Sequence, residues 1–163
     1  MEVTAELIYA EGIERTFVLG QLTEVSAMME AELRWAFVRL DGGGDAAMVA
    51  AGQSVSWLVR RCRAAVEARA GLEAEHEQDI REALARCAEA SRTRNTLIHG
   101  LKFPGRPGEG SMQTMLSRRG TGGLEPQSWT IATMRQAAGE LILAQHALGE
   151  AIDAALAAEA KEH

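Results

Sequence analysis

The sequence predicts an all-α protein: an antiparallel four-helix bundle with an irregular or short β-hairpin insertion between its third and fourth helices. Aromatic residues make up only 4% of the 163 residues, while alanine and leucine are abundant, which favours helices over sheets. Apolar residues recur at steps of three and four over four long stretches. All three prolines lie within residues 101–128, so the non-helical pattern is confined to one segment. This length predicts a single domain over residues 1–163.

The first helix is expected over about 21–40, where the apolar residues form one helical stripe. Residues 1–20 are interrupted by Gly12 and Gly20, and we interpret them as a short leader that packs on the body. The stripe ends at an Asp-Gly-Gly-Gly-Asp segment whose last residue, Asp45, is a candidate cap for the next helix.

The second helix is expected over about 46–70 and the third over about 72–99, separated by Gly71. The third helix is acidic in its first half, and Gly100 is predicted to terminate it. At helical spacing, the inward-facing positions of this helix continue past Cys87, and Arg94, seven residues later, falls at the edge of the inward face. A charge there requires an anion, a partner chain or water.

The insertion over residues 101–128 contains two segments that could pair as a hairpin, 112–118 and 126–131. The fourth helix follows, and Thr133 with Gln136 has the spacing of a capping box. Its apolar stripe continues to the C-terminus.

The charge is unevenly distributed over a chain with a net charge of −6. Residues 70–90 carry six acidic and two basic side chains, whereas residues 90–119 carry six basic side chains and one acidic. A local basic surface on an acidic body suits one defined anionic partner better than general coating of nucleic acid. No apolar run of membrane-spanning length and no signal peptide is recognised, so no membrane association and a cytoplasmic location are expected. Cys62 and Cys87 are predicted to be reduced and buried.

The segment Arg94-Asn95-Thr96-Leu97-Ile98-His99 closes the third helix and carries the candidate chemistry. A guanidinium can hold a phosphate, and an imidazole can transfer a proton near neutral pH. Arg94, Asn95 and His99 are therefore the predicted catalytic residues. No zinc spacing or phosphate-binding glycine loop is present, and the Glu73-x-x-His76 spacing has no second copy, so neither a metal nor a cofactor is expected.

The chain resembles the HEPN domain family in this motif, in its position at the end of helix three of four, and in the irregular link that follows. The resemblance covers most of the chain from about Gln21 onward. It implies a metal-independent endoribonuclease in toxin, antiphage or stress defence, acting on RNA as a homodimer, with an antitoxin or defence-system protein as an additional partner. A second hypothesis, ranked below the first, is a non-catalytic helical module that binds RNA or a protein through the same cleft.

Arg94 and His99 lie roughly 140° apart on an ideal helix of 3.6 residues per turn. They meet only through the length of arginine, through an altered last turn, or across a dimer interface, and we favour a site composed of two chains. A structural alternative stays open, in which Arg94 pairs with Glu30 and His99 merely favours the helix end. A path for the RNA backbone is predicted along eight further cations: Arg60, Arg61, Arg63, Arg92, Lys102, Arg106, Arg118 and Arg119.

Overall fold

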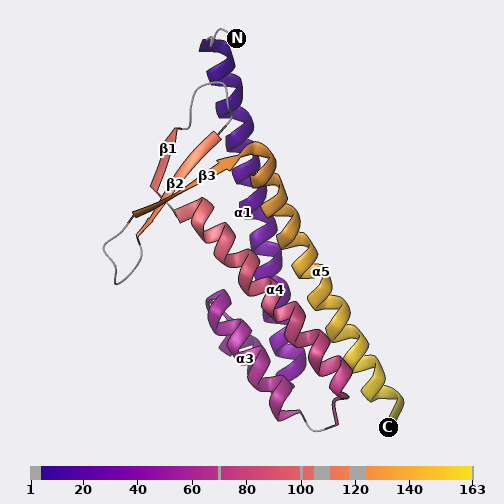
Figure 1. The fold of residues 1–163 in the computed structure, drawn as a ribbon. Helices are drawn as coiled ribbons and strands as arrows, with labels where there is room; N and C mark the ends of the chain where they lie inside the picture. The colour runs from indigo at the N-terminus through magenta and orange to yellow at the C-terminus, as the bar shows by residue number, and fades with distance from the viewer. Residues whose placement is uncertain (1–4, 70, 100, 105–110, 118–123, 163) are drawn as a thin grey trace. The chain divides into compact units, whose positions relative to one another are not determined.

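The protein is mostly helical and carries one small antiparallel sheet. Its computed structural model describes residues 5–69, 71–99, 101–104, 111–117 and 124–162. The elements in chain order are α1 (Ala5–Asp41), α2 (Ala46–Ala50), α3 (Val55–Ala68), α4 (Ala74–His99), β1 (Leu101–Pro104), β2 (Ser111–Ser117), β3 (Leu124–Thr130) and α5 (Ile131–Glu162) (Figure 1).

The chain divides into two compact units. The first unit contains the residues up to Val25 together with Arg92–Gly139, and therefore holds the sheet and the end of α4. The second unit contains Ser26–Ser91 and the residues from Glu140 onward.

The core of the second unit is formed by α1, α3, α4 and α5. Phe37, Leu58, Leu84 and Ile152, one from each of these helices, are at most 1% exposed. Leucine and isoleucine side chains buried in this way stabilise a fold by about 1.5–3 kcal/mol each. Leu58, Leu84 and Ile152 belong to the predicted inward stripes, whereas Phe37 was not part of the stripe predicted for the first helix.

Both cysteines lie in the second unit and are free and buried, as predicted. Cys62 donates its thiol proton to the carbonyl of Leu33 at 3.7 Å, and Cys87 donates to the carbonyl of Ala144 at 3.5 Å. Burial raises the pKa of each thiol from 9.0 to about 12. Both groups are therefore uncharged and unreactive near neutral pH.

The expectation of a short leader over residues 1–20 is wrong for the described part, because α1 begins at Ala5 and continues to Asp41 without a break. A glycine inside a helix costs only about 1 kcal/mol relative to alanine, so Gly12 and Gly20 weaken the helix without ending it. Val18 and Leu22 are both fully buried, so this part of α1 is packed and is not a free leader.

The predicted second helix over 46–70 is divided into α2 and α3. Gly52 adopts a φ of 70°, a left-handed conformation that breaks the helix and that glycine adopts without strain. Ser54 then caps α3 by accepting a hydrogen bond from the backbone N–H of Trp57 at 3.3 Å. Asp45 occupies the N-cap position of α2, but its side chain makes no capping hydrogen bond.

The predicted hairpin is confirmed in the first unit, where β2 and β3 pair antiparallel with Ser111 opposite Thr130. A third strand, β1, was not predicted and pairs with β2 in the order β1-β2-β3. Within the sheet, the indole N–H of Trp129 donates to the hydroxyl of Thr114 at 2.9 Å, and both side chains are buried.

The cap of α5 lies three residues earlier than predicted. The N–H of Thr130 donates to the Thr133 hydroxyl at 2.8 Å, and the N–H of Thr133 donates back to the Thr130 hydroxyl at 3.1 Å. This reciprocal arrangement is a capping box in which Thr133 is the third helical residue rather than the cap.

The expectation that no segment reaches membrane-spanning length is wrong for α5. Among the described residues, the helical stretch Ile131–Lys161 is long and apolar enough to cross a membrane. Core helices of soluble proteins pass the same test, so this is weak evidence for a membrane span. Its apolar length is not evident from the sequence, because single charges interrupt the alanine-rich stretch.

Candidate functional site

The last two turns of α4 carry the candidate site, and they lie in the first unit. Leu97 is fully buried and anchors this end of the helix. Arg94 is half-buried, whereas Asn95 and His99 are exposed. Asn95 and His99 are four residues apart and therefore share one helical face.

The three predicted catalytic side chains are brought together within a single chain. Arg94 Nη1 donates a hydrogen bond to Asn95 Oδ1 at 2.9 Å and lies 3.4 Å from His99 Nε2. Three ways for Arg94 and His99 to meet were considered from the sequence. In the structure, the length of the arginine side chain brings Arg94 into contact with His99. The angular separation of Arg94 and His99 thus gives no reason to require a second chain.

Arg94 makes no ion pair with a carboxylate in the part of the chain that the structure describes. Glu30, the pairing partner considered from the sequence, instead pairs with Arg34 on α1 at 3.4 Å. Arg94 Nε is buried and has no hydrogen-bond partner among the described residues. A buried N–H group left without an acceptor costs about 1–3 kcal/mol. Its guanidinium therefore keeps donor capacity that none of the described residues uses.

This arrangement matches the chemical needs of a phosphate site. A guanidinium with unused donors can bind two oxygens of one phosphate in a fork. The exposed imidazole of His99 lies beside it and can accept or donate a proton. Asn95 holds the guanidinium through its carbonyl oxygen, which leaves its amide N–H₂ group available to a ligand.

Only part of the predicted RNA path can be placed. Arg60, Arg61 and Arg63 are exposed on α3, in the second unit. Arg92 is exposed near the motif and already has an interaction partner. The structure does not bring these two groups together in one unit. The Lys102 side chain and residues Arg106, Arg118 and Arg119 lie outside the described part.

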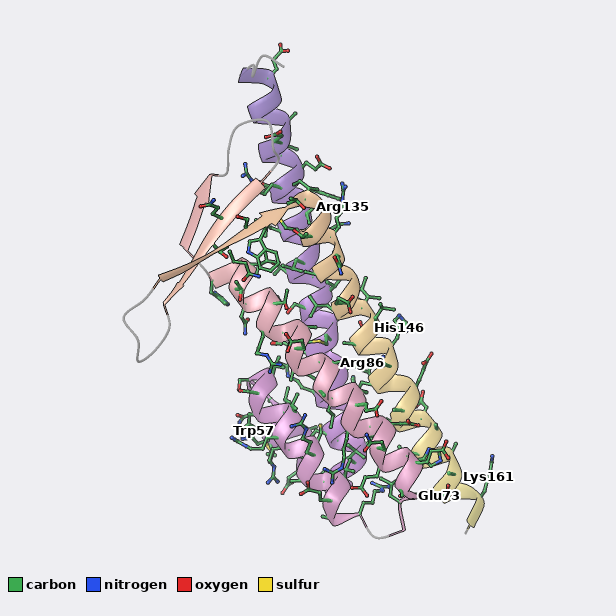
Figure 2. All side chains as sticks on the ribbon, in the orientation of Figure 1. Trp57, Glu73, Arg86, Arg135, His146 and Lys161 are labelled. Carbon is green, nitrogen blue, oxygen red and sulfur yellow. The ribbon has the colours of Figure 1, made fainter. Side chains whose placement is uncertain are left out.

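Aromatic packing accounts for one of the α3 arginines. The guanidinium of Arg61 lies over the rings of Phe37 and Trp57, at 5.8 and 5.7 Å from their centroids. The two rings meet edge to face with centroids 5.6 Å apart. Figure 2 labels Trp57 on α3. Arg61 therefore has a packing role on α3 whether or not it contacts RNA.

An exposed apolar ridge on α1, formed by Tyr9, Ile13 and Phe17, was missed from the sequence. These side chains are 72, 54 and 62% exposed and line a shallow, open depression together with Gly12 and Thr16. Their four-residue spacing is the signal that could have identified the ridge, but residues 1–20 were interpreted as a leader.

Among the described residues, no group of three or more histidine, cysteine or acidic side chains could hold a metal ion. His76, the histidine of the Glu73-x-x-His76 spacing, has a buried Nδ1 to which none of the described residues donates or offers an acceptor. Comparison of the chain with known protein families, curated proteins and solved structures finds no match. The interpretation of the site therefore depends on its own geometry.

Proposed function

We propose that this protein is a HEPN-like, metal-independent endoribonuclease that acts as a homodimer in toxin, antiphage or stress defence. One observation supports this proposal above the others: Arg94, Asn95 and His99 converge in one chain, and the described residues give Arg94 no carboxylate. An arginine without an acidic partner, beside an accessible imidazole, is suited to hold and process a phosphodiester.

The proposed reaction uses the 2′-hydroxyl of the RNA as the nucleophile. His99 accepts the proton of this hydroxyl, its oxygen forms a bond to phosphorus, and the bond from phosphorus to the 5′-oxygen breaks. The departing oxygen takes a proton from water or from His99 of a second copy. Arg94 stabilises the charge that develops on the phosphate oxygens, an effect of about 2.7–4 kcal/mol for one well-placed donor. The products are a 2′,3′-cyclic phosphate and a free 5′-hydroxyl.

In this proposal α1, α3, α4 and α5 are the four helices of an antiparallel HEPN-like bundle, and the β-sheet is the insertion before the last helix. The motif at the end of α4, directly before β1, supports this assignment. The proposed location is the cytoplasm, where RNA is the substrate and an antitoxin or a defence-system protein can act as a partner.

The ridge of Tyr9, Ile13 and Phe17 supports the proposed homodimer. It lies in the first unit, as does the Arg94 site, and it leaves three large apolar side chains in water. Burying such side chains is favourable by about 1.5–3 kcal/mol each, and two-fold dimers are the commonest oligomers. Gly12 and Gly20 have open space where a Cβ would stand, so a partner helix could approach α1 closely.

RNA cleavage in the presence of a chelator tests the proposal. Wild-type protein is expected to yield cyclic-phosphate ends, and Arg94→Ala and His99→Ala are each expected to lower the rate at least a hundredfold. Arg86→Ala and His146→Ala are matched controls, since both side chains are exposed on α4 and α5 (Figure 2) and should leave the rate unchanged. Absence of cleavage, or equal cleavage by wild type and both motif variants, would refute the proposal.

A groove between α4 and α5 favours the protein-binding form of the alternative, a non-catalytic module, but it lies in the second unit and not at the Arg94 site. This groove has a volume of about 330 Å³ and a floor of alanines that includes Ala83 and Ala151. The groove is lined by three acidic side chains, Asp79, Glu82 and Glu150, and by one basic side chain, Arg86. A basic helical segment would therefore fit the groove by charge and size. Tight binding of such a partner by a protein that leaves RNA intact would select this alternative.

A further inference from the structure

The contact between Arg94 Nη1 and His99 Nε2 limits which ring nitrogen of His99 can carry the proton. A guanidinium has five N–H donors and no acceptor. The contact at 3.4 Å can therefore be attractive only if Nε2 presents its lone pair. The imidazole is then neutral and carries its proton on Nδ1. A protonated ring would set two donors and two positive charges against each other.

The same contact occupies the nitrogen that a base must use. A lone pair of His99 Nε2 that accepts from Arg94 Nη1 at 3.4 Å is not available to a hydroxyl group. Arg94 is itself poorly satisfied in this position. Its acceptors are a neutral amide oxygen and a neutral ring, and its buried Nε has no partner in the described structure.

A phosphodiester offers Arg94 better acceptors. Hydrogen bonds between a guanidinium and an anionic oxygen are roughly twice as strong as bonds between neutral groups, and the fork can make two of them at once. Transfer of Arg94 from His99 to a phosphate therefore lowers the free energy of the arginine, and it releases the lone pair of Nε2 at the place where the 2′-hydroxyl arrives.

On these grounds we propose that Arg94 masks the base of this site: it holds His99 Nε2 in the free protein, and phosphodiester binding draws it away and exposes Nε2. This inference rests on the proposed ribonuclease function and adds its regulation, because the imidazole becomes a base only when substrate is present. Asn95 is a positioning residue in this scheme, since its Oδ1 sets the strength with which Arg94 is retained.

Nitrogen-15 NMR of histidine-labelled protein above pH 8 tests the masking directly, because protonated and unprotonated ring nitrogens have well-separated shifts. The His99 signals are identified by their loss in His99→Gln. We expect His99 to carry its proton on Nδ1, with Nε2 shifted by its hydrogen bond. Arg94→Ala should remove that shift and relax the tautomer toward that of an unconstrained imidazole. His146 serves as the internal control.

The second arm adds a short oligodeoxythymidine, which has phosphodiesters but no 2′-hydroxyl and therefore cannot be cleaved by this route. It should move the Nε2 signal of wild-type His99 toward its position in Arg94→Ala. Asn95→Asp should retain Arg94 through a charge-assisted bond and require at least ten times more oligonucleotide for the same change.

The possible outcomes separate the two proposals. A His99 that carries its proton on Nε2, or an Nε2 signal that responds neither to Arg94→Ala nor to the oligonucleotide, would overturn the masking even if the protein cleaves RNA. A response of Nε2 in a protein that never cleaves RNA would support the masking and refute the ribonuclease.

Discussion

Two arginines, one in each unit, differ sharply in how their donors are used. Arg69, just after α3, makes two hydrogen bonds to Glu159 at 2.7 and 2.8 Å and donates to the carbonyls of Arg39 and Leu40. Its hydrogen bond with Glu159 raises the pKa of the guanidinium above its ordinary value. Among the described residues, Arg94 contacts only an amide oxygen and an imidazole nitrogen, and its Nε has no partner there.

The difference separates a structural arginine from a candidate functional one. Arg69 connects the end of α1 to α5, and its donors face acceptors that the fold supplies. Arg94 sits in a place where the described chain supplies no anion. Polar groups that the protein leaves unsatisfied indicate where a ligand can bind.

The largest expected effect on stability is that of Arg69→Ala. It should lower the free energy of unfolding by about 1.5–3 kcal/mol, because it removes charged hydrogen bonds and leaves Glu159, only 22% exposed, without its arginine. Arg94→Ala should leave stability unchanged, since it also removes an unsatisfied donor. Urea denaturation monitored by circular dichroism measures both.

Arg81→Ala is the matched control for this comparison. Arg81 also binds two carboxylates, Glu67 and Glu77, but it lies at the surface and should contribute no measurable stability. A larger loss of stability in Arg94→Ala than in Arg69→Ala would contradict the assignment of Arg69 as the structural arginine and Arg94 as the functional one.

The buried thiols of the second unit predict a loss of stability at alkaline pH. Each thiol has a pKa of about 12 in the folded protein and about 9.0 when exposed, so between these values the unfolded chain releases protons that the folded chain retains. Stability is therefore full below pH 9 and falls as pH rises, by up to about 1.4 kcal/mol per unit for each thiol.

Urea denaturation at pH 8, 9 and 10 measures this slope. Cys62→Ala and Cys87→Ala should each flatten it, whatever constant loss the smaller side chain introduces. A slope that is the same in wild type and in both variants would show that other groups cause the alkaline destabilisation.

The smallest expected effect concerns self-association and again compares the two units. Ile13→Glu, on the α1 ridge of the first unit, should weaken the proposed dimer at least tenfold, about 1.4 kcal/mol. Ile142→Glu places the same charge on an exposed isoleucine of α5 in the second unit and should have no effect. Sedimentation velocity over a concentration series measures both. Equal weakening by both substitutions, or none by Ile13→Glu, would exclude the ridge as the interface.

Much of the fold was predictable, because apolar residues recur along the sequence with the period of the helices that bury them. The stripes of α1, α3, α4 and α5 and the pairing of β2 with β3 were predicted, and their apolar positions are largely buried. Predictions that relied on glycine alone were less reliable. Gly12 and Gly20 do not interrupt α1, whereas Gly52 breaks the helix between α2 and α3 by adopting a left-handed φ. A glycine permits a break, and the surrounding packing decides whether one forms.

The sequence by itself determined the helical class, the inward-facing residues and the position of Arg94, Asn95 and His99 at the end of one helix, because these depend on local periodicity and residue chemistry. Only the tertiary structure decided that Arg94 contacts Asn95 and His99, that the described residues supply it with no carboxylate, and that Arg69 binds Glu159 and two backbone carbonyls. Side-chain partners depend on which surfaces meet after the chain has packed, and spacing along a helix cannot specify them.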